Sequence, residues 1–212
     1  MLTHELRNQI VVIEGFATTM LQNWESMPSE QQLDLLERVT RNAHQMHALV
    51  DAFSDVHKVE NETFEISRLP TDLDRLVGDI TTDLIGLGSH HIELAVKDQV
   101  VVEVDPVRIR QVLTNLLSNA AKFAPPSSTI HVSVDMNEHY AEIVVSDEGP
   151  GVPDHLRDEL FRPFSRLGVE DKEGAGLGLY ISRGIARAHG GDLFLAPGSE
   201  GACFVMILPL VA

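Results

Sequence analysis

Two heptad patterns near the start of the chain restrict its possible folds more than any other feature. Apolar residues recur there at alternating spacings of four and three, which is typical of helices that pack in a coiled coil or a bundle. One helical hairpin has too little core to stand alone, so we expect two hairpins to pair as a four-helix bundle in a homodimer. The two patterns comprise Leu6, Ile10, Ile13, Ala17, Met20 and Trp24, and then Leu36, Val39, Ala43, Met46, Val50 and Phe53.

A short polar segment separates the two expected helices. The first helix should end near Trp24, and the second should run from Ser29 to about residue 57. Ser29 and Gln32 have the spacing of a capping box, which would satisfy free N–H groups at the start of the second helix. Positions 1–60 are therefore predicted to be one antiparallel hairpin.

Charge and composition exclude several classes of protein. A formal net charge of −16 argues against nucleic-acid binding, because such binding needs Lys and Arg to neutralise phosphates. No apolar run approaches the ~18 residues of a membrane helix, and no signal peptide is recognisable, so we expect a cytoplasmic chain without membrane contact of its own. Whether an upstream region of the parent protein carries a membrane anchor is left open. The single Cys203 excludes an intrachain disulfide and fits a buried thiol in a reducing compartment.

Helix and strand patterns alternate in the rest of the chain. Residues 61–70 are predicted to be a linker with a short strand near 64–66, followed by a second domain over 71–212 whose first helix begins at Thr71. Asp105 and Pro106 predict a helix start, with the helix running to about Phe123. Helices on one face of a mixed sheet would make this domain an α/β sandwich, and the whole chain an α+β protein. The expected strands are 92–96, 101–104, 129–136, 140–146, 193–196 and 203–208, and a third helix is expected over 176–189.

Three motifs in the second domain suggest a nucleotide site. One is a polar row on the helix after Pro106, the next is an Asp-Glu-Gly-Pro-Gly turn that ends a strand, and the third is a glycine-rich segment directly before a helix. Free N–H groups and the dipole at a helix N-terminus attract phosphate. Each motif alone has an ordinary explanation as a turn or a solvated face. The residues concerned are Asn115, Asn119 and Lys122; Asp147, Gly149 and Gly151; and Gly174, Gly176, Leu177 and Gly178.

Taken in order, these motifs resemble the sensor histidine kinases of two-component signalling, and the resemblance covers essentially the whole chain. Residues 1–10 resemble the H box of that family, while 111–123, 147–152, 161–166 and 174–179 resemble its N, G1, F and G2 boxes. The resemblance implies a hairpin for dimerisation and phosphate acceptance, and a sandwich that binds ATP, as in gyrases, chaperones and histidine kinases. Five boxes in the family's order leave little room for coincidence.

For the hairpin, the resemblance implies that His4 accepts the γ-phosphoryl group of ATP and passes it to an aspartate of a response regulator receiver domain. His4 and Asn8 lie one turn apart on the outer face of the heptad helix. Glu5 would orient the imidazole or take its proton, and Asn8 would position a water that dephosphorylates the regulator. Gln9 stands where the family usually has Pro, which puts the usual helix kink in question. We also expect this helix to continue upstream of Met1 in the parent protein, so that the present chain is a weakened kinase.

For the second domain, the resemblance implies that Asp147 binds the adenine amino group and that Asn119 coordinates Mg²⁺. The remaining motif residues would surround the phosphates. Phe161 and Arg166 would belong to a lid over the nucleotide, together with the charged stretch 168–173.

Two other functions remain open at this stage. A catalytically silent dimeric scaffold would only dock a regulator, and a gyrase- or chaperone-like ATPase would hydrolyse ATP without phosphorylating His4. Intact Asp147 and Asn119 argue against the scaffold, and the residues around His4 argue against the ATPase.

Overall fold

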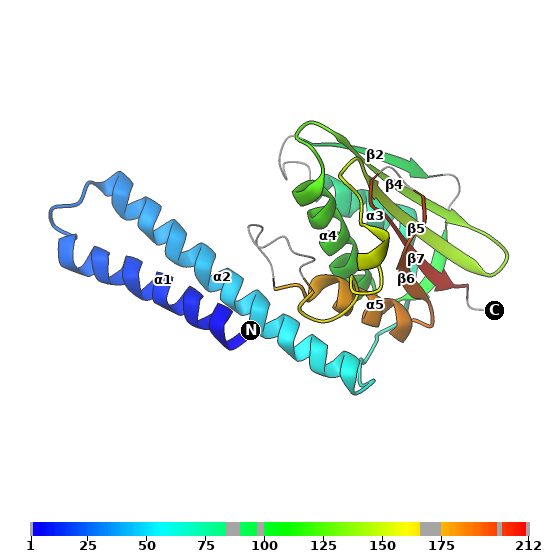
Figure 1. Ribbon diagram of the computed structural model, residues 1–212, viewed down its shortest axis with the longest axis horizontal. Coiled ribbons are helices and arrows are strands. Elements are labelled where there is room, and N and C mark those ends of the chain that lie inside the picture. Colours follow the sequence, from blue (N-terminus) through cyan, green and yellow to red (C-terminus); the bar gives the residue numbers. More distant parts are fainter. Residues whose placement is uncertain (1, 84–89, 97–99, 166–174, 199–200, 211–212) are drawn as a thin grey trace.

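A long helical hairpin extends from an α/β sandwich in the computed structural model (Figure 1). The structure describes residues 2–83, 90–96, 100–165, 175–198 and 201–210, with the backbone alone at 2–5. The hairpin consists of α1 (Leu2–Asn23) and α2 (Ser29–Glu60), in agreement with the two heptad patterns. Met20 is buried between them, whereas Ile10 and Leu36 stay 43% and 45% exposed, so part of the apolar face is uncovered in a single chain.

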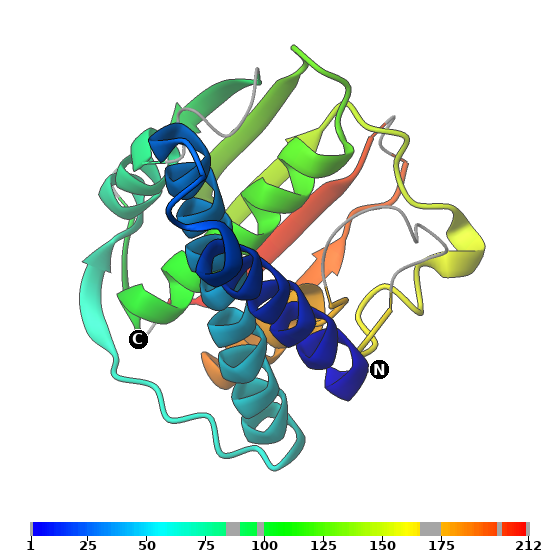
Figure 2. The ribbon, with the colours of Figure 1, turned by 90° about the vertical axis from the view of Figure 1, so that its left-hand side faces the viewer.

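The sandwich confirms the predicted mixed sheet with helices on one face. Its five strands lie in the order β2-β4-β5-β7-β6, and only β2 and β4 are parallel. Helices α3, α4 and α5 cover one side of this sheet, which Figure 2 shows from the helical side. The elements are α3 (Leu73–Asp83), β2 (His91–Val96), α4 (Pro106–Phe123), β4 (Thr129–Met136), β5 (Tyr140–Asp147), a short 3₁₀ helix (Asp154–Leu156), α5 (Gly178–Ala188), β6 (Asp192–Leu195) and β7 (Cys203–Pro209).

The core lies between the sheet and α4. Ile130, Val132 and Val134 are buried at alternate positions of β4, and Leu113 and Leu116 are buried on α4. Because the apolar side of α4 faces this core, its polar side is left to face outward along the sandwich. No helix within the described residues combines the length and the apolar character that crossing a bilayer requires.

The start of α4 is capped as predicted. The Asp105 side chain accepts hydrogen bonds from the backbone N–H groups of Val107 and Arg108, at 3.0 and 3.2 Å. Pro106 occupies the first turn, where its missing N–H costs nothing. The cap therefore sets where the polar row of α4 begins.

The strand predicted near residues 64–66 was wrong. The strand of this segment is β1 (Leu69–Asp72), which pairs antiparallel with β3 (Val101–Val104). Phe64 instead packs against the core with the Arg108 guanidinium 4.7 Å from its ring centre. Thr71 belongs to β1, so α3 begins later than predicted.

The predicted capping box of α2 was also wrong. Pro28 occupies the N-cap position, and no side chain among the described residues caps the helix there. The Gln32 Nε2 group donates instead to the backbone oxygens of Trp24 and Met27, at 2.9 and 3.0 Å. Gln32 thus holds the connection between α1 and α2 because the carbonyl groups of that turn lie within its reach.

Candidate functional site

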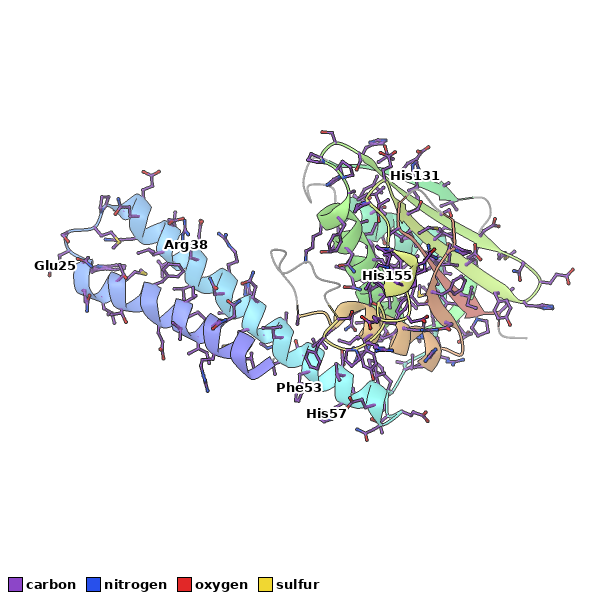
Figure 3. The ribbon with its side chains drawn as sticks, in the orientation of Figure 1. Glu25, Arg38, Phe53, His57, His131 and His155 are labelled. Atoms are coloured by element: carbon purple, nitrogen blue, oxygen red, sulfur yellow. The ribbon has the colours of Figure 1, made fainter. Side chains whose placement is uncertain are left out.

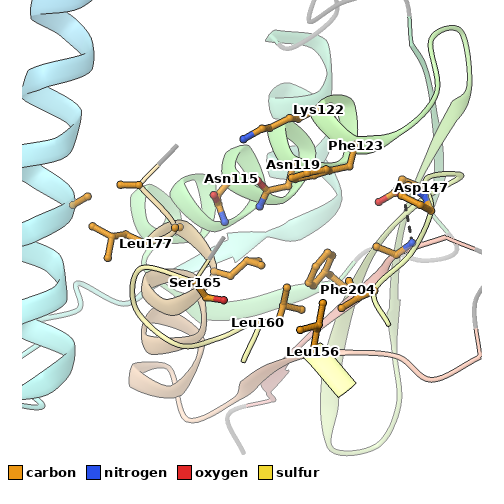
Figure 4. Close-up of a pocket in the computed structure, with 18 of the residues that line it drawn as sticks. Asn115, Asn119, Lys122, Phe123, Asp147, Leu156, Leu160, Ser165, Leu177 and Phe204 are labelled. Carbon is orange, nitrogen blue, oxygen red and sulfur yellow. Dashed lines mark hydrogen bonds between the residues drawn. The ribbon is translucent and has the colours of Figure 1, made fainter. Parts of the chain in front are cut away.

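A cavity of about 800 Å³ lies where the sandwich meets the hairpin (Figure 4). Its walls are the polar side of α4, the loop before α5, the segment 150–160, the ends of β5 and β7, one side of α2, and Gln9 of α1. Eight of the residues predicted for the nucleotide site line it: Asn115, Asn119, Lys122, Asp147, Gly151, Gly176, Leu177 and Gly178. Motifs far apart in the sequence therefore meet at one place.

The polar row of α4 forms one wall. Asn115, Asn119 and Lys122 lie along the same side of the helix, toward the cavity (Figure 4). The Asn115 Nδ2 group donates to the Ser182 hydroxyl of α5 at 3.1 Å, which ties α4 to α5. Gly178 packs directly against Asn115, and a Cβ at that glycine would collide with the Asn115 amide. Glycine at position 178 therefore leaves room for the Asn115 amide beside the N-terminus of α5.

Asp147 lies at the far end of the cavity from the hairpin, where β5 ends. Its Oδ1 atom accepts hydrogen bonds from the N–H groups of Gly149 at 2.8 Å and Ala202 at 3.4 Å. Burial raises the pKa of the Asp147 carboxyl, although both hydrogen bonds act in the opposite direction. Gly149 does not line the cavity but is needed to hold this carboxylate, because a Cβ there would lie 2.6 Å from Oδ1.

The glycine-rich segment supplies the wall next to α5. Gly176 has a φ of +67°, and a Cβ on it would lie 2.5 Å from the Ser165 backbone oxygen. Leu177 occupies the N-cap position of α5, with no capping hydrogen bond from a side chain in the described part of the chain. The N-terminus of a helix carries N–H groups without intrahelical partners and favours an anion, so this wall suits a phosphate.

The predicted lid is only partly described. Phe161 packs edge-on against Phe204, with ring centres 6.5 Å apart, and lies under the Arg183 guanidinium at 4.9 Å. It does not line the cavity, whereas its neighbour Leu160 does. Arg166, Gly174 and the stretch 168–173 fall outside the described residues.

The hairpin brings the predicted phosphoacceptor helix to the same cavity. Backbone positions His4 and Glu5 belong to the first turns of α1, but their side chains fall outside the described residues. Asn8 is exposed on α1 and does not line the cavity. Gln9 does line it, although the sequence marked this position only as a departure from the usual Pro and gave it no place in the nucleotide site.

The other histidines give no sign of a second centre. His57, His131 and His155 lie on α2, β4 and the 3₁₀ helix, apart from one another (Figure 3). Within the described ranges, no three or more His, Cys, Asp or Glu side chains gather in a way that could hold a metal ion.

Comparison with known families decides which kind of protein this cavity belongs to. The His Kinase A (phospho-acceptor) domain matches residues 1–62, and the histidine kinase-, DNA gyrase B- and HSP90-like ATPase family matches residues 104–212. The chain belongs to the sensor histidine kinase family. The order of the two matched regions also agrees with the hairpin and the sandwich of this chain.

Individual relatives agree with the family. The sensor histidine kinase TmoS of Ectopseudomonas mendocina is 33% identical over 220 residues, which cover 99% of this chain and 22% of TmoS. This chain spans between 22% and 29% of the length of the first three curated relatives.

Solved structures share the fold. The histidine kinase AdeS of Acinetobacter baumannii has a TM-score of 0.76 at 23% identity, covering 99% of this chain and 98% of AdeS. The histidine kinase ThkA, solved in complex with the response regulator TrrA, has a TM-score of 0.70 at 22% identity, covering 99% of this chain and 60% of ThkA.

Proposed function

We propose that this chain transfers the γ-phosphoryl group of ATP to its own His4 and then passes it to an aspartate of a receiver domain. The main support is that one cavity is shared by the nucleotide motifs of the sandwich and by the hairpin whose first turns carry His4. An ATPase that did not phosphorylate the hairpin would not require α1 and α2 to line its nucleotide cavity.

The adenine end of the nucleotide is assigned to Asp147. Its Oδ1 atom is already engaged by the N–H groups of Gly149 and Ala202, which leaves Oδ2 to accept a hydrogen bond from the adenine amino group. The phosphates would then extend along α4 toward the N-terminus of α5. Gly151, with a φ of +67°, lets the backbone pass close to the nucleotide.

The metal is assigned to Asn119. Mg²⁺ takes few protein ligands and keeps several waters, so one half-buried amide oxygen that lines the cavity fits it. When bound, Mg²⁺ would screen the charge of the phosphates. Lys122 lines the same wall and would add positive charge at the phosphate side of the cavity.

The transfer itself needs a neutral imidazole. A ring nitrogen of His4 would form a bond to the γ-phosphorus while the bond from that phosphorus to the leaving oxygen of ADP breaks. We assign to Glu5 the role of accepting the imidazole proton, because the family resemblance implies it. Asn8, one turn beyond His4 and exposed, would position a water for dephosphorylation of the regulator.

The partners follow from the hairpin. The apolar positions left exposed along α1 and α2 would be covered by the hairpin of a second copy in a four-helix bundle. ThkA is known in complex with a response regulator, and we assign the same class of partner to this chain.

Labelled ATP tests the proposal. Wild-type chain incubated with γ-labelled ATP and Mg²⁺ should retain acid-labile, alkali-stable label, and His4→Gln should retain none while still binding ATP. Label that is released as phosphate by both proteins would indicate an ATPase, and ATP that is never consumed would indicate a scaffold. Asp147→Asn, which removes the charge but keeps the shape, should lose nucleotide binding and labelling together.

A further inference from the structure

We propose that Gln9 binds the phosphate end of the nucleotide, so that α1 of the hairpin completes the nucleotide site of its own chain. This inference rests on the proposed function, because it assumes that the cavity holds ATP. It adds a ligand contact from the phosphoacceptor helix, at a position where the histidine kinases that the chain resembles usually have Pro.

The observation behind it is an unpartnered amide. Gln9 lines the cavity, and its Oε1 atom is inaccessible to solvent without any hydrogen-bond partner among the described residues. Buried polar atoms in folded proteins are nearly always hydrogen-bonded, so no hydrogen bond of Oε1 within the described residues holds the Gln9 amide in place, and the amide can turn to present a donor or an acceptor to a ligand in the cavity.

The contacts between the hairpin and the sandwich explain why α2, on which α1 packs, lies at the cavity. Asp55 of α2 accepts a hydrogen bond from Gln111 of α4 at 2.9 Å, and Val59 packs against Gly184 of α5, where any Cβ would collide with it. The same side of α2 continues along the cavity at positions three or four apart. The cavity residues of α2 are Gln45, Ala48, Leu49 and Ala52.

The position of the hairpin at the cavity indicates that Gln9 would contact the phosphate end of the nucleotide. Asp147, the adenine contact of the proposed function, lies at the side away from α2, and Asn115 lies between the two (Figure 4). The hairpin therefore faces the part of the nucleotide that extends furthest from adenine. A glutamine amide can donate from Nε2 to a phosphate oxygen and can accept at Oε1 from a metal-bound water.

Position along α1 connects this contact with the reaction. His4 precedes Gln9 by five residues, which is about 7.5 Å along a helix axis. Five residues also turn about 140° around the helix, so Gln9 and His4 project from different faces of α1. A contact between Gln9 and the terminal phosphate would therefore bring the nucleotide beside the helix that carries the acceptor, and His4 remains the group that reacts.

Calorimetry on the full chain tests the proposal. The probes are the β,γ-imido analogue of ATP and ADP, each with Mg²⁺. Gln9→Ala should weaken binding of the triphosphate analogue about three- to tenfold, as expected for one hydrogen bond, and should leave ADP binding unchanged. Gln9→Glu should weaken the triphosphate further, because its charge would repel the phosphates. Gln22→Ala, an exposed glutamine on the same helix, is the matched control and should change neither affinity.

Two results would overturn the inference. One is triphosphate binding by Gln9→Ala at the wild-type affinity, and the other is an equal loss for triphosphate and diphosphate, which would indicate a structural role. Circular dichroism establishes that each variant is folded. The Asp147→Asn variant distinguishes an error in the role of Gln9 from an error in the proposed function. If that variant binds both nucleotides with the wild-type affinity, the assignment of the cavity to ATP is itself wrong.

Discussion

Asp55 of α2 and Gln111 of α4 are joined by a hydrogen bond of 2.9 Å that ties the hairpin to the helix forming one wall of the cavity. The Asp55 carboxylate is only 5% exposed and also pairs with Arg108 at 3.3 Å and with Lys58 at 3.2 Å. A buried carboxylate with three partners is a strong contact between the two parts of the chain.

Replacing Asp55 with Ala should therefore destabilise the protein. The change leaves the largely buried Arg108 without its carboxylate, and the expected loss is about 1.5–3 kcal/mol in the free energy of unfolding, measured with urea. Asp51→Ala is the control one turn earlier, because its hydrogen bond to His47 is 3.0 Å long but both side chains are exposed. That control should change stability by less than about 0.5 kcal/mol. Equal effects of the two substitutions would mean that Asp55 does not hold the parts together.

Gly178→Ala should impair nucleotide binding more than folding. Its Cβ would displace the Asn115 amide, which lines the cavity and donates to the Ser182 hydroxyl of α5. We expect affinity for ATP to fall at least about tenfold if two phosphate contacts are disturbed. Gly78→Ala in α3 is the control, since its Cβ would meet only Leu94 at 3.9 Å, and this change should raise helix stability by about 0.5–1 kcal/mol. Similar ATP affinities for both variants would contradict the role assigned to this close approach.

The free energy of unfolding should decrease in mild acid because His189 is buried in the folded protein. The ring is 2% exposed, accepts the Asp105 N–H at Nε2 at 3.0 Å, and lies 2.8 Å from the Ile185 oxygen through Nδ1. Burial lowers the pKa of this histidine below 6.5, so just below that pH the unfolded chain binds more protons than the folded chain. The free energy of unfolding should therefore decrease as pH falls through 6.5, by at most about 1.4 kcal/mol per pH unit from this group.

Urea unfolding between pH 5.5 and 7.5 measures this effect. His189→Gln should be less stable than the wild type at pH 7.5, yet its stability should change less over that range. If the free energy of unfolding changes with pH as steeply in His189→Gln as in the wild type, the pH dependence comes from other groups.

Phosphorylation of His4 should occur within one chain of the dimer. The cavity of this chain is lined by its own Gln9 and its own Asn115, so a nucleotide bound there would lie beside the helix that carries its own His4. Mixed dimers of a His4→Gln chain and an Asp147→Asn, Asn119→Ala chain should incorporate no more label from γ-labelled ATP than either parent alone. Label that appears only after mixing the two parents would mean that transfer crosses between chains.

Periodicity and local capping chemistry explain what could be predicted from the sequence. The heptads of α1 and α2 and the Asp105-Pro106 start of α4 depend on neighbouring residues, and the structure confirms them. The strand near residues 64–66 and the Ser29 cap were predicted on the same kind of local pattern. They were wrong because β3 pairs with Leu69–Asp72 and because Gln32 reaches the carbonyl groups of the turn, which are choices that depend on the surrounding fold.

The sequence by itself determined the family, the order of the two domains and most of the polar residues that line the cavity, because these rest on motifs with fixed local spacing. Only the tertiary structure decided that α2 docks on α4 and α5 through Asp55 and Val59, and that Gln9 and the α2 face from Gln45 to Ala52 line the cavity. The physical reason is that docking depends on a buried charge network and on a glycine matched to a valine across more than a hundred residues of chain. The local pattern around Gln45 does not distinguish it from other polar residues on exposed helices, and the replacement of the usual Pro by Gln9 does not by itself indicate that this side chain lines the cavity.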